Sequence, residues 1–221
     1  MLLKFFLALC AIALAVSGGI FGARWAELRY ASERSVLSFP GRLAAQTKRR
    51  PMILAGVYGL IFTWSMLTSG VVSGAESLGF AILTLLFVLV FQFFLVLFTI
   101  TDFEQRVIFD RMLVPFAILG ALSLPLLGHV VTDHLIAAVI GFAVFLALAF
   151  LTHGAIGGGD IKLITVLGLW LGTDQLLAVA IAGLLLSGLA ALILLAMGRN
   201  QKDLSNYTPC FPLAAIVMTM V

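Results

Sequence analysis

Charged residues are scarce in this sequence of 221 residues: they make up 10% of it, whereas hydrophobic residues make up 62%. Soluble globular domains are about a quarter charged and about half apolar, so the composition excludes that class. The net charge of +3 is too small and too localised for a nucleic-acid-binding surface. The many apolar runs indicate membrane helices rather than a barrel. The predicted fold class is all-α, a polytopic integral membrane protein.

Cysteine and histidine are also rare, with two and three residues in the whole sequence. Cys10 and Cys210 lie far apart in apolar context and match neither a disulfide nor a metal-ligand spacing. Residues 23–50 contain no cysteine and no histidine. No thiolate zinc site can therefore form in that stretch, and we expect the protein to hold no metal.

Apolar segments follow one another along the chain and predict about eight transmembrane helices. The sixth and the eighth are short and cover only about 20 Å of a hydrocarbon core of about 30 Å. Either the sixth extends into the glycines before it, or its helix begins at Asp160 below the membrane surface. The segments are 2–22, 51–73, 78–101, 112–128, 132–152, 160–172, 175–197 and 209–221.

Basic residues gather just after the first apolar segment, in residues 23–50. The segment itself resembles a signal peptide, but such a cluster favours a retained first helix, residues 1–22, followed by a cytoplasmic loop. Mixed apolar and charged residues in the loop predict an interfacial helix pair broken at Pro40-Gly41. Residues 51–221 are then the helical membrane domain.

The other loops divide by charge. Those expected in the cytoplasm carry Lys or Arg and those expected on the opposite side carry none: 102–111 and 198–208 are of the first kind, and 74–77, 129–131 and 173–174 of the second. Under this topology, Asp102 and Asp160 both face the cytoplasm.

Asp102 and Asp160 are the candidate catalytic residues. A carboxylate near hydrocarbon is costly and is usually functional, and two carboxyls that can meet form an acid–base pair for hydrolysis. Two simpler interpretations stay open. Asp102 would be a solvated helix-end charge that pairs with Arg106, and Asp160 would be a helix N-cap. We expect Glu104 and Asp110 to be solvated loop charges or salt-bridge partners.

Glycines precede the second aspartate: Gly154, then Gly157, Gly158 and Gly159. Glycine permits positive φ and close backbone approach, so these residues are candidates for shaping a substrate site. A plain loop is the alternative. Lys162 follows Asp160, and we expect it either to reach the lipid headgroups or to bind a substrate carboxylate.

These motifs resemble those of the type IV prepilin peptidases, membrane aspartic proteases of the GxGD type. The resemblance covers roughly residues 80–215. Its most specific part is the run from Gly157 to Leu163, which contains the aspartate of the GxGD segment. The other parts are Asp102 with Val107-Ile108, and the segment Pro209–Ala214 at the last helix.

The resemblance implies an endopeptidase with Asp102 and Asp160 as its catalytic pair. It would remove short basic leaders from prepilins or pseudopilins, after a glycine, at the cytoplasmic face of the bacterial inner membrane. The partners would be these substrates and lipids, without nucleic acid. No cofactor is expected for proteolysis.

Three departures from the family pattern are visible. Phe109 stands where the family usually has proline, and Phe211 stands where glycine is common. Residues 23–50 lack the two CxxC pairs of many bacterial members. The missing pairs leave N-methylation with S-adenosylmethionine an open question.

Two functions of other classes also fit part of the pattern. A proton-coupled carrier uses intramembrane carboxylates and broken helices, but its site should lie near the bilayer midplane rather than at one face. An inactive assembly scaffold is the second alternative, although the presence of both aspartates disfavours it.

Overall fold

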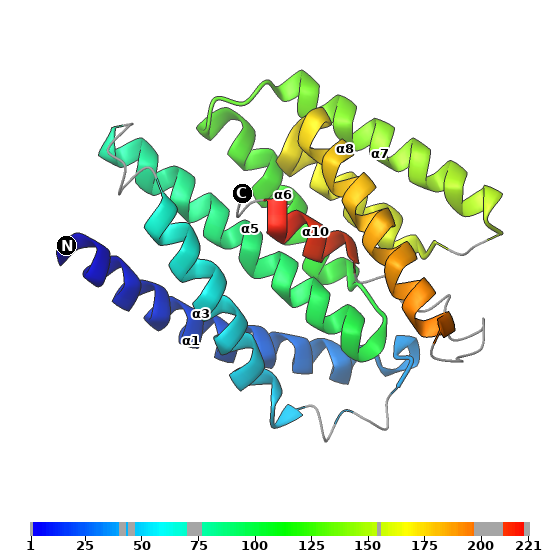
Figure 1. The fold of residues 1–221 in the computed structure, drawn as a ribbon, viewed down its shortest axis with the longest axis horizontal. Helices are drawn as coiled ribbons and strands as arrows, with labels where there is room; N and C mark the ends of the chain where they lie inside the picture. The colour runs from blue at the N-terminus through cyan, green and yellow to red at the C-terminus, as the bar shows by residue number, and fades with distance from the viewer. Residues whose placement is uncertain are drawn as a thin grey trace. The chain divides into compact units, whose positions relative to one another are not determined.

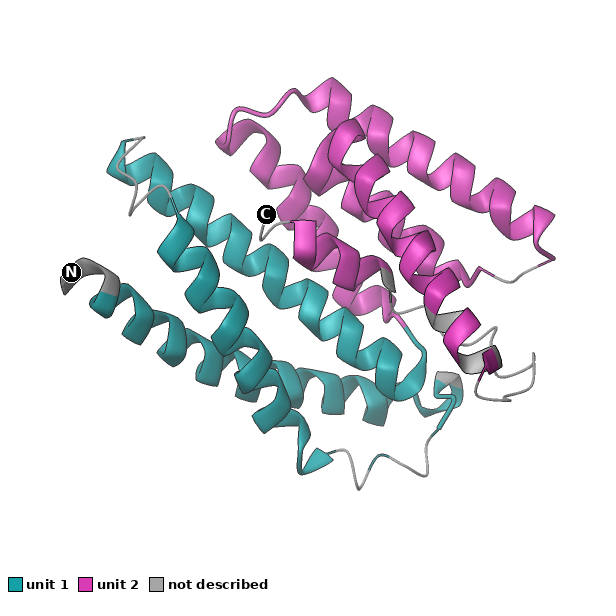
Figure 2. Ribbon diagram, in the orientation of Figure 1, with its two compact units in different colours: residues 1–107, 219–221 teal, residues 108–218 magenta. Residues whose placement is uncertain are grey.

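The computed structural model describes residues 2–39, 43, 47–69, 77–153, 156–196 and 210–218. Every regular element in these residues is a helix (Figure 1), and five helices are long and apolar enough to cross a membrane. The predicted class, an all-α membrane protein, is confirmed. Two compact units can be distinguished: the first ends at Val107 and the second runs from Ile108 to Met218 (Figure 2).

The first unit consists of α1 (Leu2–Ser32), α3 (Arg50–Thr68), α5 (Leu78–Gln105) and one short 3-10 turn, η1 (Arg34–Val36). α1 and α3 pack closely because Gly19 has no side chain: a Cβ there would lie 2.7 Å from the backbone nitrogen of Ala55. Small residues allow this close approach between membrane helices.

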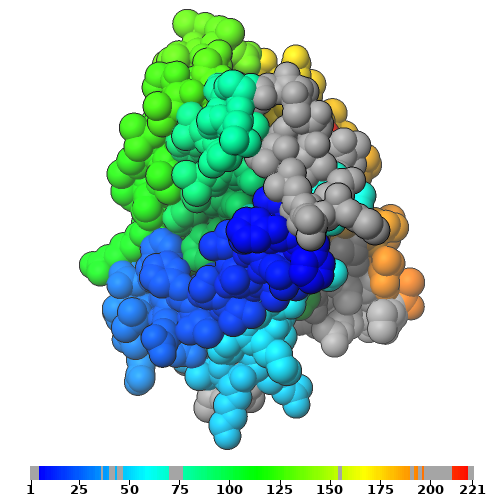
Figure 3. Space-filling view, turned by 90° about the vertical axis from the view of Figure 1, so that its left-hand side faces the viewer, coloured from blue at the N-terminus to red at the C-terminus, as the bar shows by residue number. Residues whose placement is uncertain are grey.

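The outer face of α1 is apolar. α1 runs across the face shown in Figure 3 (blue), and Phe5 and Phe21 are 67% and 60% exposed. Large exposed apolar side chains on a long apolar helix are expected where the helix faces lipid.

Three buried polar side chains inside the first unit form hydrogen bonds. The Tyr58 hydroxyl donates to the Phe93 carbonyl oxygen over 2.9 Å, and the Tyr58 ring stacks on the rings of Phe62 and Phe93. Ser65 and Gln92, both buried, hydrogen-bond to each other at 2.7–3.0 Å. The buried polar groups of Tyr58, Ser65 and Gln92 thus have partners, as burial favours.

The first helix differs from its prediction. It continues past residue 22 to Ser32, so part of the predicted loop, residues 23–32, is helical. The chain then makes the turn η1 rather than the first helix of an interfacial pair. Residues from Ala23 to Tyr30 keep an apolar face at helical spacing, with Ala23, Ala26 and Tyr30 buried, and this packing extends the helix. The predicted break at Pro40-Gly41 lies outside the described residues.

The second unit consists of α6 (Asp110–Leu126), α7 (Val131–Leu151), α8 (Gly158–Ala196) and α10 (Cys210–Met218). The Trp170 ring stacks on Phe116, and its indole N–H donates to the Phe116 carbonyl oxygen over 3.0 Å. Gly168 lies so close to α7 that a Cβ there would be 2.6 Å from the backbone nitrogen of Ala138. Aromatic and glycine contacts thus join α6 and α7 to the first half of α8.

α8 folds back on itself at Gly172. A Cβ on Gly141 of α7 would lie 3.1 Å from both Ile164 and Leu176, yet these two residues would be about 18 Å apart on a straight helix. Gly172 has φ 73° and ψ −178°, a conformation that is essentially restricted to glycine. The reversal lies at the predicted junction between the sixth and seventh apolar segments.

The number of helices does not confirm eight spans. α8 contains two of the predicted segments, and its start at Gly158 shows that the sixth extends into the glycines. Among the described helices, α6 has 17 residues and α10 has 9, and neither is among the five long enough to cross a membrane.

Candidate active site

Asp102 lies in the last turn of α5, as the sequence predicted. Its side chain is half-buried. Its carbonyl oxygen accepts the backbone N–H of Arg106 over 2.7 Å, and Arg106 is left-handed with φ 56°. A left-handed residue at this position ends a helix. The carboxyl of Asp102 therefore lies at the carbonyl end of α5.

Glu104 belongs to the same turn and is a salt-bridge partner, one of the two roles predicted for it. The Arg50 Nε lies 2.8 and 3.0 Å from the two Glu104 carboxylate oxygens, and the Tyr30 hydroxyl donates to one of them over 3.0 Å. The Arg50 side chain is 0% exposed and that of Glu104 is 14% exposed. In the sequence, Arg50 is only one of the basic residues of 23–50, because its partners are remote in sequence.

Gln105 also holds this turn. Its amide oxygen accepts the backbone N–H of Phe39 over 2.9 Å, and its amide nitrogen donates to the Phe39 carbonyl oxygen over 3.1 Å. The Arg106 guanidinium lies 4.9 Å from the centre of the Phe39 ring, within the range of a cation–π contact. The last turn of α5 is thus tied to the segment after η1 by two hydrogen bonds and a ring contact.

Asp160 is in the first turn of α8 and is 6% exposed. It is not the N-cap: the helix begins at Gly158, and the backbone N–H groups of Asp160 and Ile161 both bond the Gly157 carbonyl oxygen. The side chain folds back so that one carboxylate oxygen lies 3.3 Å from where a Cβ on Gly157 would be. At the N–H end of α8, the helix dipole favours a negative charge.

The glycines before Asp160 provide space rather than unusual backbone angles. The positive φ that we considered for them is not found at Gly157, Gly158 or Gly159. A Cβ on Gly159 would lie 3.3 Å from the Ile108 Cβ, whereas one on Gly158 would meet nothing within 4 Å. Close packing therefore restricts the first and third glycines and leaves the middle one open. Gly154 lies outside the described residues.

Lys162 forms an ion pair with Asp110, the first residue of α6, with Nζ 2.8 and 2.9 Å from the carboxylate oxygens. The two side chains are 53% and 67% exposed, and such pairs contribute about 0–1 kcal/mol. Asp110 is thus a salt-bridge partner, which is one of the two roles predicted for it. Lys162 has a carboxylate partner on its own unit, which neither of its predicted roles included.

The predicted residues are divided between the two units. Asp102 belongs to the first unit, and Gly157, Gly158, Gly159, Asp160 and Lys162 belong to the second. Within the second unit, these residues all lie at the start of α8, next to Ile108 and Asp110. The aspartates have opposite helical environments, one at a carbonyl end and one at an N–H end.

Metal ligands do not cluster in the described part of the chain: no three His, Cys, Asp or Glu side chains there are grouped to hold an ion.

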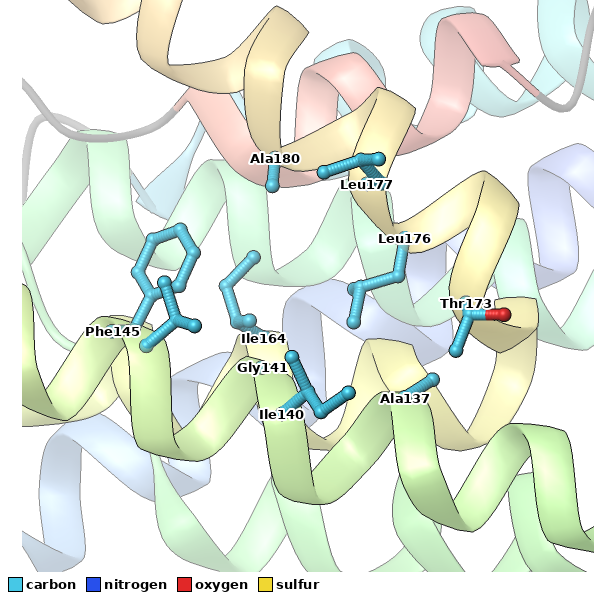
Figure 4. Close-up of a pocket in the computed structure, with 10 residues that line it drawn as sticks. Ala137, Ile140, Gly141, Phe145, Ile164, Thr173, Leu176, Leu177 and Ala180 are labelled. Atoms are coloured by element: carbon cyan, nitrogen blue, oxygen red, sulfur yellow. The ribbon is translucent and has the colours of Figure 1, made fainter.

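The second unit contains an apolar cavity of about 260 Å³ between α7 and the two arms of α8 (Figure 4). Thr173 brings the only hydroxyl among its lining residues, which include Ile140, Phe145 and Leu177. None of its lining residues carries a charge.

Comparisons with known proteins bear on the same residues. Residues 89–196, which include both aspartates, match the type IV leader peptidase family. A prepilin leader peptidase/N-methyltransferase of Bacillus subtilis (strain 168) is 34% identical to the chain over 116 residues, or 51% of this chain and 46% of that relative. The match therefore spans about half the length of the curated relative. No solved structure matches the chain.

Proposed function

We propose that this chain, a member of the type IV leader peptidase family through residues 89–196, is a membrane aspartic endopeptidase. It would remove the short basic leader of prepilin-like proteins, after a glycine, at the cytoplasmic face of the inner membrane. One observation carries the proposal: both helix-end aspartates, Asp102 and Asp160, fall inside the family-matched residues. The alternative of a proton-coupled carrier has no corresponding support.

The chemistry would depend on one proton shared between two carboxyls, because two nearby carboxylates do not both ionise cheaply. The ionised aspartate takes a proton from water, and the water oxygen attacks the scissile carbonyl carbon. The protonated aspartate donates a hydrogen bond to the carbonyl oxygen and then a proton to the leaving amine. No metal and no cofactor enters these steps.

The two helix ends suggest which aspartate has which role. The N–H end of α8 favours charge on Asp160, whereas the carbonyl end of α5 disfavours charge on Asp102. We therefore assign the base to Asp160 and the acid to Asp102. The pair titrates as a unit, so this assignment describes the dominant arrangement of the shared proton.

The substrate would remain partly in the bilayer. A prepilin has an apolar helix next to its basic leader, so the helix can stay in lipid while the leader lies in the cytoplasm. N-methylation with S-adenosylmethionine is not included in the proposal. Residues 23–50 lack the cysteine pairs and lie outside the family-matched residues.

The test is cleavage of a purified prepilin by the full chain in detergent, with the new N-terminus sequenced. Asp102→Asn and Asp160→Asn should each abolish cleavage while the protein still inserts into the membrane. Asp174→Asn is the matched control, because Asp174 is an exposed aspartate of α8 within the same matched residues. Near-normal cleavage by Asp102→Asn or Asp160→Asn would remove that residue from the site. A chelator should leave the rate unchanged.

A further inference from the structure

A buried ion pair in the first unit is not used by the proposed chemistry. Arg50, the first residue of α3, is 1% exposed. Its guanidinium bonds Glu104 of α5, approaches Glu27 of α1 at 3.4 Å and lies 4.9 Å from the centre of the Tyr30 ring. The cluster thus joins the ends of three helices.

Such a pair is not explained by stability alone. Removing two charges from water is costly, and well-packed apolar residues of similar size are often as stabilising as a buried pair. What a guanidinium adds is direction, since its N–H donors form a rigid planar fork: here Nε contacts Glu104 and Nη1 contacts Glu27. The Arg50 Nε is within 3.0 Å of both oxygens of Glu104. The pair therefore fixes where the Glu104 side chain points.

Glu104 is two residues after Asp102 on the same helix. Residues at this spacing project about 200° apart around a helix. When Glu104 is held toward α1 and α3, the carboxyl of Asp102 must point away from them. Helix ends fray unless they are held, so the orientation of Asp102 depends on what holds this turn.

We propose that the Arg50–Glu104 ion pair, supported by the Tyr30 hydroxyl, is a positioning device that sets the direction of Asp102. The proposal rests on the proposed function, because it assigns a role in that reaction. Arg50 and Glu104 are positioning residues: they act through the last turn of α5.

The test compares Arg50→Met with Arg49→Met in the full chain. Both substitutions remove one positive charge at the start of α3, but Arg49 is exposed and only Arg50 is buried against Glu104. We expect Arg50→Met to lower kcat about a hundredfold, the loss typical of a shift of about 1 Å in a catalytic group. KM should change by less than about threefold, and Arg49→Met should cleave at the wild-type rate. Rates are expressed per folded protein.

Two further variants separate positioning from folding. Glu104→Gln should also lower kcat, and Arg50→Met/Glu104→Gln should be no slower than the slower single variant, because both act through one contact. Arg50→Lys keeps the charge without the fork and should recover only part of the rate. The inference would be overturned if the double variant lost kcat by the product of the two single losses, or if Arg50→Met kept full activity.

Hydrogen exchange gives a readout that does not require activity. The backbone N–H of Arg106, which closes this turn on Asp102, should exchange at least about tenfold faster in Arg50→Met than in Arg49→Met. Unchanged exchange would overturn the inference. A wild-type chain that cleaves no prepilin would refute the proposed function instead, and exchange would still show whether the pair holds the turn.

Discussion

Gly157, Gly158 and Gly159 are adjacent and chemically identical, yet their surroundings differ. The first lies beside the carboxylate of Asp160 and the third against Ile108, whereas the second faces open space. The importance of each glycine therefore depends on what a side chain would displace.

The predicted consequence is unequal effects of one substitution. Gly157→Val should displace the Asp160 carboxylate and Gly159→Val should press on Ile108, so each should lower the cleavage rate by at least about tenfold. Gly158→Val is the matched control and should retain most of the rate. Cleavage is measured together with the level of membrane-extracted protein. Equal rates in all three variants would contradict a role of this turn in placing Asp160.

The choice of a second control also follows from the structure. By sequence, Gly183 and Gly188 are equivalent glycines in an apolar segment. A side chain on Gly183 would collide with Phe211, which packs edge-on against Phe145, whereas one on Gly188 would meet nothing within 4 Å. Gly188→Val is thus a suitable control for valine in α8, whereas Gly183→Val is not.

At the scale of elements, the reversal of α8 at Gly172 is held by hydrogen bonds from the first turn of α7. Asp133 in the first turn of α7 accepts the Thr173 backbone N–H over 3.2 Å and pairs with the Thr173 hydroxyl. His134 donates from Nδ1 to the Leu169 carbonyl oxygen over 2.9 Å. One turn of α7 thus caps the start of the second arm and satisfies a carbonyl at the end of the first.

Gly172→Ala should destabilise the protein, because alanine is strained at this φ and ψ and its Cβ would collide with Asp133. We expect a loss of about 2 kcal/mol or more in the free energy of unfolding, measured by SDS-induced unfolding in mixed micelles. Gly128→Ala is the reference substitution, since Gly128 also has a positive φ of 71° but open space, and it should cost about 1 kcal/mol. A loss at Gly172 no larger than the loss at Gly128 would contradict the prediction.

At the scale of the whole molecule, the distribution of basic residues is the basis for the proposed orientation in the membrane. α7 offers a direct test, because its two ends should lie on opposite sides. Val130, just before the helix, is 67% exposed, and Thr152, just after it, is also exposed. The end at Thr152 leads to the glycines and Asp160.

In a background with Cys10→Ala and Cys210→Ala, a membrane-impermeant maleimide should label Val130→Cys from outside intact spheroplasts. Thr152→Cys should be labelled only after the membrane is permeabilised, because the positive-inside rule puts this end in the cytoplasm. The reverse pattern would place Asp160 on the outer side and would exclude cleavage of a cytoplasmic leader.

Much of this protein can be predicted from local sequence. Hydropathy predicts the membrane class, and the bounds of α7 follow closely from its apolar run, because the cost of exposing backbone and charge to hydrocarbon acts on each segment by itself. The candidates Asp102 and Asp160 also follow from local context, since a carboxylate at the end of a long apolar run is rare without a purpose.

The tertiary structure alone decided the contacts between remote residues. In the sequence, Arg50 is one basic residue among several, and nothing there predicts its ion pair with Glu104. The contact between Ile108 and Gly159 is not predictable from the sequence either. The sequence marks the position of the break in α8, but not the capping of that break by Asp133 of another helix. The physical reason is that hydropathy and helical spacing are properties of neighbouring residues, whereas ion pairs, caps and close glycine contacts depend on which surfaces packing brings together.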